Sequence, residues 1–231
     1  MRHIAILIFP GVQSLDVAGP LDVFAEANRF LPHADQYHLT VLGTEAGLIQ
    51  SSSGLLLGAH CLYSQTSGVF DLLLVPGGPF LPERPYDPDL SGWLASAARA
   101  SARHGSVCNG AFLLGSAGLL EGRKVTTHWN DAALLATRFP GATVDADRLY
   151  LRDGNLYSSA GVTAGIDLSL FLLNGDFGPD LALKVAKRLV VFTQRSGGQS
   201  QGLSRAVLKF ARQASRSEQA TRPWRAVQDR G

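Results

Sequence analysis

The chain has 231 residues, of which 45% are hydrophobic and 17% are charged, so it is long enough for one α/β domain with a sizeable core. Residues 202–231 carry seven basic and two acidic side chains, which leaves 14 basic and 17 acidic ones in residues 1–201. The mildly acidic body argues against a nucleic-acid surface there. No run of about 18 apolar residues and no signal-peptide pattern occurs, which predicts a cytoplasmic protein without membrane contact.

The chain contains two cysteines, Cys61 and Cys108, which are far apart and lie in no paired spacing. This arrangement indicates neither a disulfide framework nor a cysteine-based zinc site. We therefore expect reduced thiols, no metal and no cofactor.

The first half of the chain alternates short apolar runs with helical patterns. Strands are predicted at 3–9, 37–42, 55–60 and 70–75. Gly19 and Pro20 are predicted to break the pattern before a helix resumes at Leu21. Asp16 lies just after the first strand, where open α/β sheets bind ligands. After the fourth strand, Pro76-Gly77-Gly78-Pro79 forms a turn whose backbone N–H groups can approach a ligand or anion closely.

The second half continues the alternation. Helices are predicted at 87–103, 130–138, from about 160 to 174 and from 180 to about 194. Further strands are predicted at 124–127, 148–152 and 155–159, the last two joined by a hairpin turn at Asp153-Gly154. This order of elements indicates an α/β fold with a parallel sheet that helices cover on both faces. A weakly amphipathic helix at 203–213 is the most that the tail would form.

Cys108 stands between a short extended run and an apolar helical pattern. At such a turn the helix dipole favours the thiolate and makes the sulfur a better nucleophile. The match to the nucleophile-elbow motif is partial, because Gly110 stands two residues after the cysteine but Ser106 replaces the earlier glycine. The residues alone leave open a buried, inert cysteine.

Five motifs in order resemble the ThiJ/PfpI superfamily, which has the class I glutamine-amidotransferase-like fold. They are DVAGP at 16–20, PGG at 76–78, SVCNGAF at 106–112, GLLEGR with TTHW at 118–129, and SAGVTAGID at 159–167. The resemblance spans nearly all of residues 1–201 and implies a ThiJ/PfpI-like domain at 1–195. It implies a flavodoxin-like three-layer sandwich with a mostly parallel central sheet and a nucleophile elbow at Cys108.

Within that superfamily the chain is similar to two groups, the isonitrile hydratases and the amidase-like sensor domains of AraC-type transcription regulators. The segment 189–201 resembles the end of the regulators' sensor domain, whereas residues 196–231 read as a linker and basic tail without a complete helix-turn-helix domain. We therefore expect a small-molecule-binding regulator domain that lacks its DNA-binding half. It is expected to form homodimers and not to bind DNA sequence-specifically by itself. An isonitrile hydratase that makes an N-substituted formamide is the alternative.

The resemblance also implies the chemistry of the site. Asp16 is expected beside the Cys108 sulfur, with one shared proton that leaves a thiolate next to a protonated carboxyl. If the protein is an enzyme, this pair implies a cysteine-dependent hydro-lyase. The residues expected to bind the ligand are Gly77, Gly78, Asn109, Gly110 and His128.

Asn109 and His128 limit which reactions the site is expected to catalyse. Hydratase-like members commonly have threonine where this chain has Asn109, and PfpI-type hydrolases have histidine there, so a protease or glutaminase loses support. For His128, a structural role that bridges strand and helix is favoured over catalysis.

Overall fold

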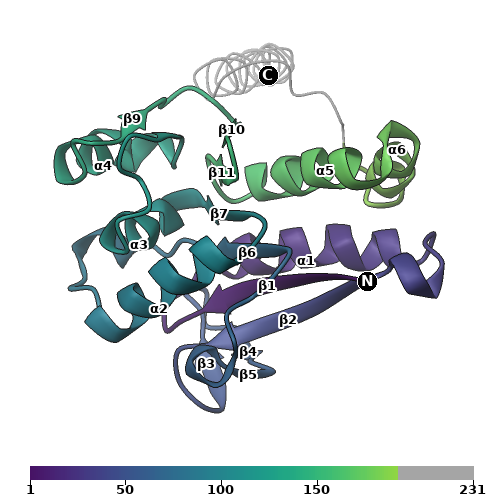
Figure 1. Ribbon diagram of the computed structural model, residues 1–231, viewed down its shortest axis with the longest axis horizontal. Coiled ribbons are helices and arrows are strands. Elements are labelled where there is room, and N and C mark those ends of the chain that lie inside the picture. Colours follow the sequence, from purple (N-terminus) through teal and green to yellow (C-terminus); the bar gives the residue numbers. More distant parts are fainter. Residues whose placement is uncertain (192–231) are drawn as a thin grey trace, which may run out of the picture. The chain divides into compact units, whose positions relative to one another are not determined.

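A seven-stranded sheet forms the centre of the computed structural model, which describes residues 1–191 (Figure 1). Its strands are β1 (Arg2–Ile8), β2 (Tyr37–Gly43), β5 (Cys61–Leu62), β6 (Leu72–Val75), β7 (His104–Val107), β10 (Tyr150–Asp153) and β11 (Leu156–Ser159). They are ordered β10-β11-β7-β6-β1-β2-β5, and every neighbouring pair is parallel except β10 and β11. The predicted mostly parallel sheet is confirmed.

Strand β1 occupies the middle of this sheet. It pairs along its length with β2, from Arg2 opposite Tyr37 to Ile8 opposite Gly43, and on its other side with β6. Residues 4–8 are fully buried, because helices cover both faces of the sheet. This is why the strand reads as a continuous apolar run rather than an alternating one.

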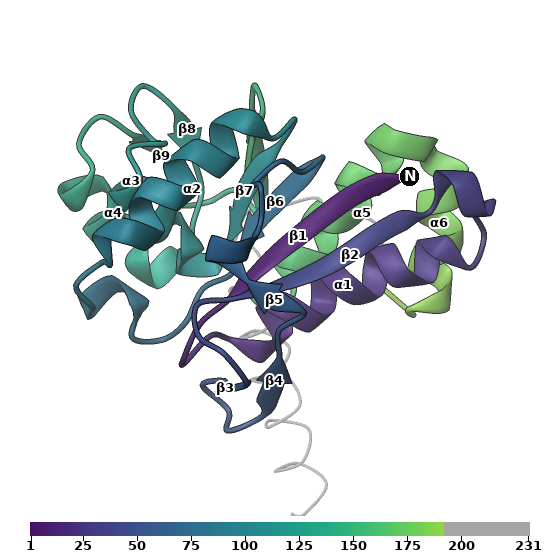
Figure 2. The same cartoon turned by 60° about the horizontal axis from the view of Figure 1, so that its bottom comes forward.

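Helices cover the sheet from both sides. They are α1 (Ser14–Asn28), α2 (Pro88–Ala100), α3 (Ala111–Ser116), α4 (Ala132–Arg138), α5 (Ala164–Phe177) and α6 (Pro179–Arg188). Helices α1, α5 and α6 contact one another on one face, whereas α2 and α3 pack together on the other (Figure 2). The predicted flavodoxin-like three-layer sandwich is therefore confirmed.

Two predicted helix boundaries are wrong. Helix α1 begins at Ser14 and continues through Gly19 and Pro20, where a break was predicted. Pro20 is buried there, and a Cβ on Gly19 would lie 3.0 Å from Ile166 of α5. The pair therefore serves close packing between two helices, which offsets the one backbone hydrogen bond that proline removes. Helix α6 ends at Arg188 and not near residue 194.

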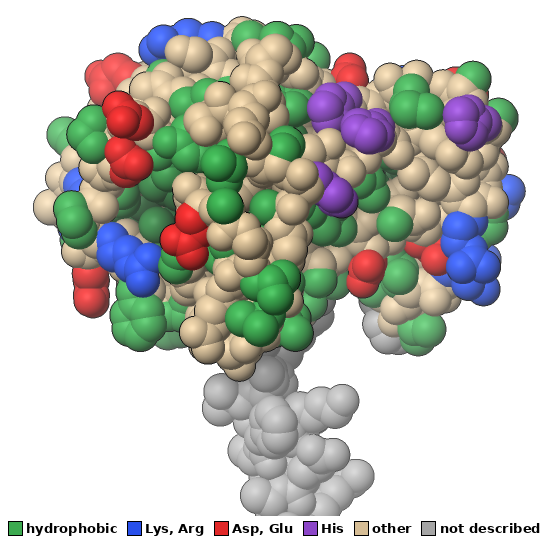
Figure 3. Space-filling model, turned by 90° about the horizontal axis from the view of Figure 1, so that it is seen from below, with side chains coloured by type: hydrophobic (Ala, Val, Ile, Leu, Met, Phe, Trp, Pro, Cys, Tyr) green, Lys and Arg blue, Asp and Glu red, His purple; other side chains and the backbone are tan. Residues whose placement is uncertain are grey.

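Four short strands lie outside the central sheet. Strands β3 (Leu48–Gln50) and β4 (Leu56–Gly58) form an antiparallel hairpin, and β8 (Lys124–Val125) pairs in parallel with β9 (Thr143–Val144). The strands predicted at 55–60 and 124–127 are therefore shorter than expected and belong to these small sheets. The β3–β4 hairpin exposes three leucines, namely Leu48, Leu55 and Leu56. Figure 3 shows hydrophobic side chains at several places on one face of the molecule.

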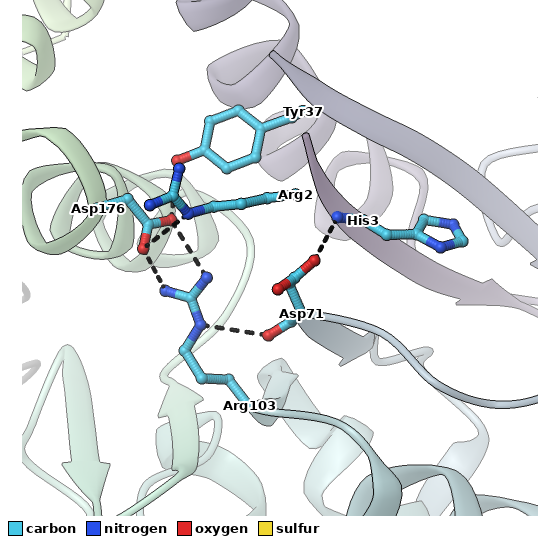
Figure 4. A network of polar contacts seen from close by, with 6 residues as sticks. All are labelled: Arg2, His3, Tyr37, Asp71, Arg103 and Asp176. Atoms are coloured by element: carbon cyan, nitrogen blue, oxygen red, sulfur yellow. Dashed lines mark hydrogen bonds and ion pairs between the residues drawn. The ribbon is translucent and has the colours of Figure 1, made fainter. Parts of the chain in front are cut away.

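A polar network fastens α5 to the amino-terminal ends of the strands (Figure 4). Asp176 accepts two hydrogen bonds from the guanidinium of Arg103, at 2.9 and 3.1 Å, and one from the hydroxyl of Tyr37, at 2.9 Å. The guanidinium of Arg2 lies 3.8 Å from the same carboxylate and over the ring of Phe177. One aspartate of α5 thus binds residues of β1 and β2 and the residue just before β7.

The tail expected at 196–231, with its weak helix at 203–213, and the domain boundary at residue 195 lie outside the described residues and stay predictions. None of the helices within residues 1–191 has the length and apolar character needed to cross a membrane.

Candidate functional site

The turn between β7 and α3 has the geometry of a nucleophile elbow. Val107 has an extended backbone, whereas Cys108 has a φ of 57°, a left-handed conformation that costs energy for a residue with a side chain. A Cβ on Gly110 would lie 2.1 Å from the carbonyl oxygen of Val75, so only glycine fits there. The predicted elbow is confirmed, and it holds Cys108 at the carboxyl edge of the sheet.

Asp16 lies directly beside this cysteine. It is fully buried in the first turn of α1, and the Cys108 thiol donates a hydrogen bond to its carboxylate. Oδ2 accepts a hydrogen bond from the Gly77 N–H at 3.1 Å, and Oδ1 accepts one from the Val162 N–H at 3.0 Å. The carboxylate is therefore fixed by three partners from three separate segments.

The acid and the thiol perturb each other. Burial raises the pKa of Asp16 to about 6, and burial together with the negative charge of Asp16 raises the pKa of the Cys108 thiol. Between these two pKa values the pair holds one proton, as expected for two adjacent buried acids.

The position of that proton differs from the predicted one. Two backbone N–H groups stabilise the charged form of Asp16, whereas among the described residues a single backbone N–H, that of Asn109, stabilises the charged form of Cys108. At neutral pH the geometry favours a thiol beside a carboxylate, not a thiolate beside a protonated carboxyl. The expected help from the helix dipole is small, because α3 has only six residues.

The 76–79 turn contacts the elbow, and the N–H groups of its two glycines both donate hydrogen bonds to side chains of the protein. Gly77 donates to Asp16, and Gly78 donates to Oδ1 of Asn109 at 2.8 Å. A Cβ on Gly77 would lie 2.4 Å from that oxygen and 2.8 Å from Cβ of Cys108. Glycine therefore lets the turn, the amide and the cysteine approach one another closely.

A second segment is joined to the elbow from the other side. Nδ2 of Asn109 donates to the Asp131 carboxylate at 3.0 Å, and the Thr127 hydroxyl donates to the Cys108 carbonyl at 2.9 Å. His128, between them, accepts a hydrogen bond from the Asn130 N–H at its Nδ1, and its ring lies beside that of Trp129. These two contacts lie within its own turn, and the structural role expected for His128, a bridge between strand and helix, stays a prediction.

The structure thus brings together six of the seven predicted site residues, namely Asp16, Gly77, Gly78, Cys108, Asn109 and Gly110. Sequence reasoning missed three others. Gly161 and Val162 belong to the motif at 159–167, and a Cβ on Gly161 would lie 2.8 Å from the Cys108 sulfur. No pattern pointed to Asp131. Within residues 1–191, no group of three or more histidine, cysteine or acidic side chains is arranged to hold a metal ion.

A model of the DJ-1/PfpI family matches residues 2–174. The chain belongs to the DJ-1/PfpI family. Among curated relatives, an isonitrile hydratase from Pseudomonas putida is 39% identical over 81% of this chain and 77% of its own length. The HTH-type transcriptional regulator CdhR from Pseudomonas aeruginosa is 34% identical over 80% of this chain and 54% of its own length. The chain thus spans about half the length of that regulator.

Solved DJ-1/PfpI structures resemble the chain in the same way. A ThiJ/PfpI family protein from Pseudomonas syringae has a TM-score of 0.74 and 25% identity, and covers 84% of this chain with 77% of its own. An AraC family transcriptional regulator from Pseudomonas putida has a TM-score of 0.73 and 26% identity, and covers 82% of this chain with all of its own. The relatives of this chain therefore include an isonitrile hydratase and transcriptional regulators.

Proposed function

We propose that this DJ-1/PfpI domain binds a small molecule at Cys108, as the ligand-binding domain of an AraC-type regulator does. The observation that carries the proposal is the occupation of the Gly78 N–H by Asn109. Cysteine catalysis that passes through an oxyanion uses free donors for the developing charge, and here the second such donor is already used. The 34% identity to CdhR supports the same conclusion.

A thermal-shift screen of small amines and amino acids tests this proposal. A true ligand at 100 times its Kd adds about 2.7 kcal/mol to the free energy of unfolding and raises the Tm by roughly 5–10 °C for a chain of this size. Cys108→Ala is expected to abolish the shift. Cys61→Ala, which alters the other, partly buried cysteine on β5, is the matched control and should keep it. Rapid turnover of isonitriles by the parent chain contradicts the proposal.

An isonitrile hydratase is the second candidate, supported by the 39% identity to the Pseudomonas putida enzyme and by the Asp16–Cys108 pair. In this reaction the Asp16 carboxylate takes the Cys108 thiol proton as the sulfur attacks the isonitrile carbon, and it then delivers that proton to the same carbon, which gives a thioimidate. Water then adds across the carbon–nitrogen double bond. Cleavage of the carbon–sulfur bond then releases an N-substituted formamide and regenerates the cysteine. Incubation with cyclohexyl isocyanide tests the candidate: formamide that appears with the parent and not with Cys108→Ala supports it, and no formamide from either removes it.

We further propose that the protein is a cytoplasmic homodimer. The exposed leucines of the β3–β4 hairpin are the apolar surface that a second copy would cover. We expect no sequence-specific DNA binding by this chain alone, because the body carries more acidic than basic residues. A gel shift with discrete, salt-resistant complexes contradicts this expectation.

A further inference from the structure

The side chain of Asn109 bridges two parts of the site. Its Oδ1 accepts the Gly78 N–H at 2.8 Å, and its Nδ2 donates to the Asp131 carboxylate at 3.0 Å. The orientation of the amide is fixed, because a backbone N–H only donates and a carboxylate only accepts. Asn109 itself is buried. Its hydrogen bond with Gly78 is shielded from water and cannot be exchanged for water at low cost, whereas the one with Asp131 is partly buried.

The Gly78 N–H belongs to the turn that packs against Cys108. At a nucleophile elbow, negative charge is held by the N–H of the residue after the nucleophile and by a second N–H from a neighbouring loop. Here the first is the Asn109 N–H, which hydrogen-bonds the Cys108 sulfur. The second comes from the 76–79 turn, where a Cβ on Gly77 would lie 2.8 Å from Cβ of Cys108. The Asn109 carboxamide occupies that second donor.

We propose that Asn109 determines the specificity of this site by blocking the Gly78 N–H. The blocked donor disfavours reactions that build an oxyanion beside Cys108 and leaves reactions and ligands that need no such donor unaffected. The inference deepens the proposed function and rests on it, since it explains how a nucleophile elbow holds a ligand without turning it over. Asn109 acts here through Gly78 and is thus a positioning residue.

Two reagents that share the Cys108 thiolate separate this effect from simple reactivity. With p-nitrophenyl acetate, the sulfur attacks the carbonyl carbon, an oxyanion forms, p-nitrophenolate leaves and a thioester remains. With iodoacetamide, the carbon–sulfur bond forms as iodide leaves, and no oxyanion arises. The ratio of the two rate constants cancels the thiolate fraction and the exposure of the sulfur. Each rate is taken as the part that Cys108→Ala abolishes, which removes the contribution of Cys61.

Asn109→Ala should raise the ratio of acylation to alkylation by about 100-fold, which is the effect of one oxyanion donor in other enzymes. Asn109→Thr should also raise the ratio, because the threonine hydroxyl ends one bond short of the Oδ1 position and cannot reach the Gly78 N–H. This variant replaces Asn109→Ala in the test if the alanine variant does not fold. The double variant Asn109→Asp with Asp131→Asn restores an acceptor for Gly78 and a donor at residue 131. Its ratio should return to within about threefold of the parent value.

An unchanged ratio in both single variants, or an equal rise of the two rate constants, overturns the proposal. So does a double variant that keeps the raised ratio. These results are independent of the proposed function, because neither reagent is a ligand of the domain. Isonitrile turnover by the parent contradicts the proposed ligand-binding function, but it does not affect the test of Asn109. An unchanged ratio of acylation to alkylation, together with a ligand that raises the Tm, contradicts only the proposed role of Asn109.

Discussion

At the scale of single residues, the charge of the site depends on one buried acid. Asp16 is fully buried, and its folded-state pKa of about 6 lies above the ordinary value of 3.8 because burial disfavours its charge. A raised carboxyl pKa means that folding favours the protonated form. Its contribution to stability is therefore complete below pH 4 and is lost as the pH rises through 6.

Asp16→Asn should remove this pH dependence. The difference between 3.8 and about 6 corresponds to about 3 kcal/mol. Between pH 4 and 7, the free energy of unfolding of the variant should rise by up to that amount relative to the parent, on top of a constant loss from the altered hydrogen bonds. Urea denaturation of both proteins at four pH values measures it. A difference that stays constant with pH contradicts the assigned pKa.

A second buried residue, His104, should make the protein less stable as the pH falls, which is the opposite of the effect of Asp16. His104 of β7 is buried, and neither of its ring nitrogens has a hydrogen-bond partner among residues 1–191. Burial and then the charge of Arg123 lower its pKa to about 4. Folding therefore favours the neutral ring, and stability is lost as the pH falls from 6.5 towards 4, by up to about 3 kcal/mol.

His104→Leu should abolish this loss, because leucine fills a similar volume without polar atoms that lack partners. Relative to the parent, the variant should gain stability steadily as the pH falls from 7 to 4, measured by the same denaturation series. His33→Leu, which alters an exposed histidine, is the control and should follow the parent. A His104 variant that also follows the parent contradicts the prediction.

At the scale of elements, the elbow depends on one glycine. Gly110→Ala would place a methyl group 2.1 Å from the carbonyl oxygen of Val75 and 2.7 Å from that of Pro76, both of which are backbone atoms. We expect a loss of roughly 3 kcal/mol or more in the free energy of unfolding. Gly175→Ala is the matched control, because Gly175 lies in α5 with no atom within 4 Å of its added Cβ. That variant should gain about 0.5–1 kcal/mol. Equal changes in the free energy of unfolding for the two substitutions would contradict the prediction that the close contact at Gly110 excludes a side chain.

Local patterns predicted the elements of this fold better than the contacts between them. The apolar run at 3–9 indicated a doubly buried strand, and the structure has it at the centre of the sheet. Pro20 was wrongly predicted to break α1, because the packing of α1 against α5 is invisible from residues that lie almost 150 positions away. The elbow was predictable from the spacing of Cys108 and Gly110.

The hydrogen bonds of the site were much harder to predict. Asp131 and Val162 contact the site through a side chain and a backbone N–H that no spacing rule connects to residue 16 or 109. The proton on Cys108 rather than Asp16 likewise follows from two specific N–H donors. Their approach is set by turns that meet only in the folded chain.

At the scale of the whole molecule, the β3–β4 hairpin carries the proposed dimer surface. Leu48 and Leu56 are 64% and 56% exposed, so replacing them with lysine should cost the monomer little while placing charges in the contact. We expect Leu48→Lys with Leu56→Lys to halve the molar mass measured by light scattering at micromolar concentration. Leu183→Lys, on the exposed side of α6, should leave it unchanged. A parent that is monomeric contradicts the proposal.

The Asp176 network has a consequence for the order in which the protein is made. Arg2, Tyr37 and Arg103 are synthesised long before the aspartate that binds all three. Until about 175 residues have left the ribosome, two cations at the ends of β1 and β7 therefore repel each other without their shared counter-ion. The sheet also lacks β11 until residue 159 is made. This fold therefore cannot be completed until α5 has emerged and packed against the sheet.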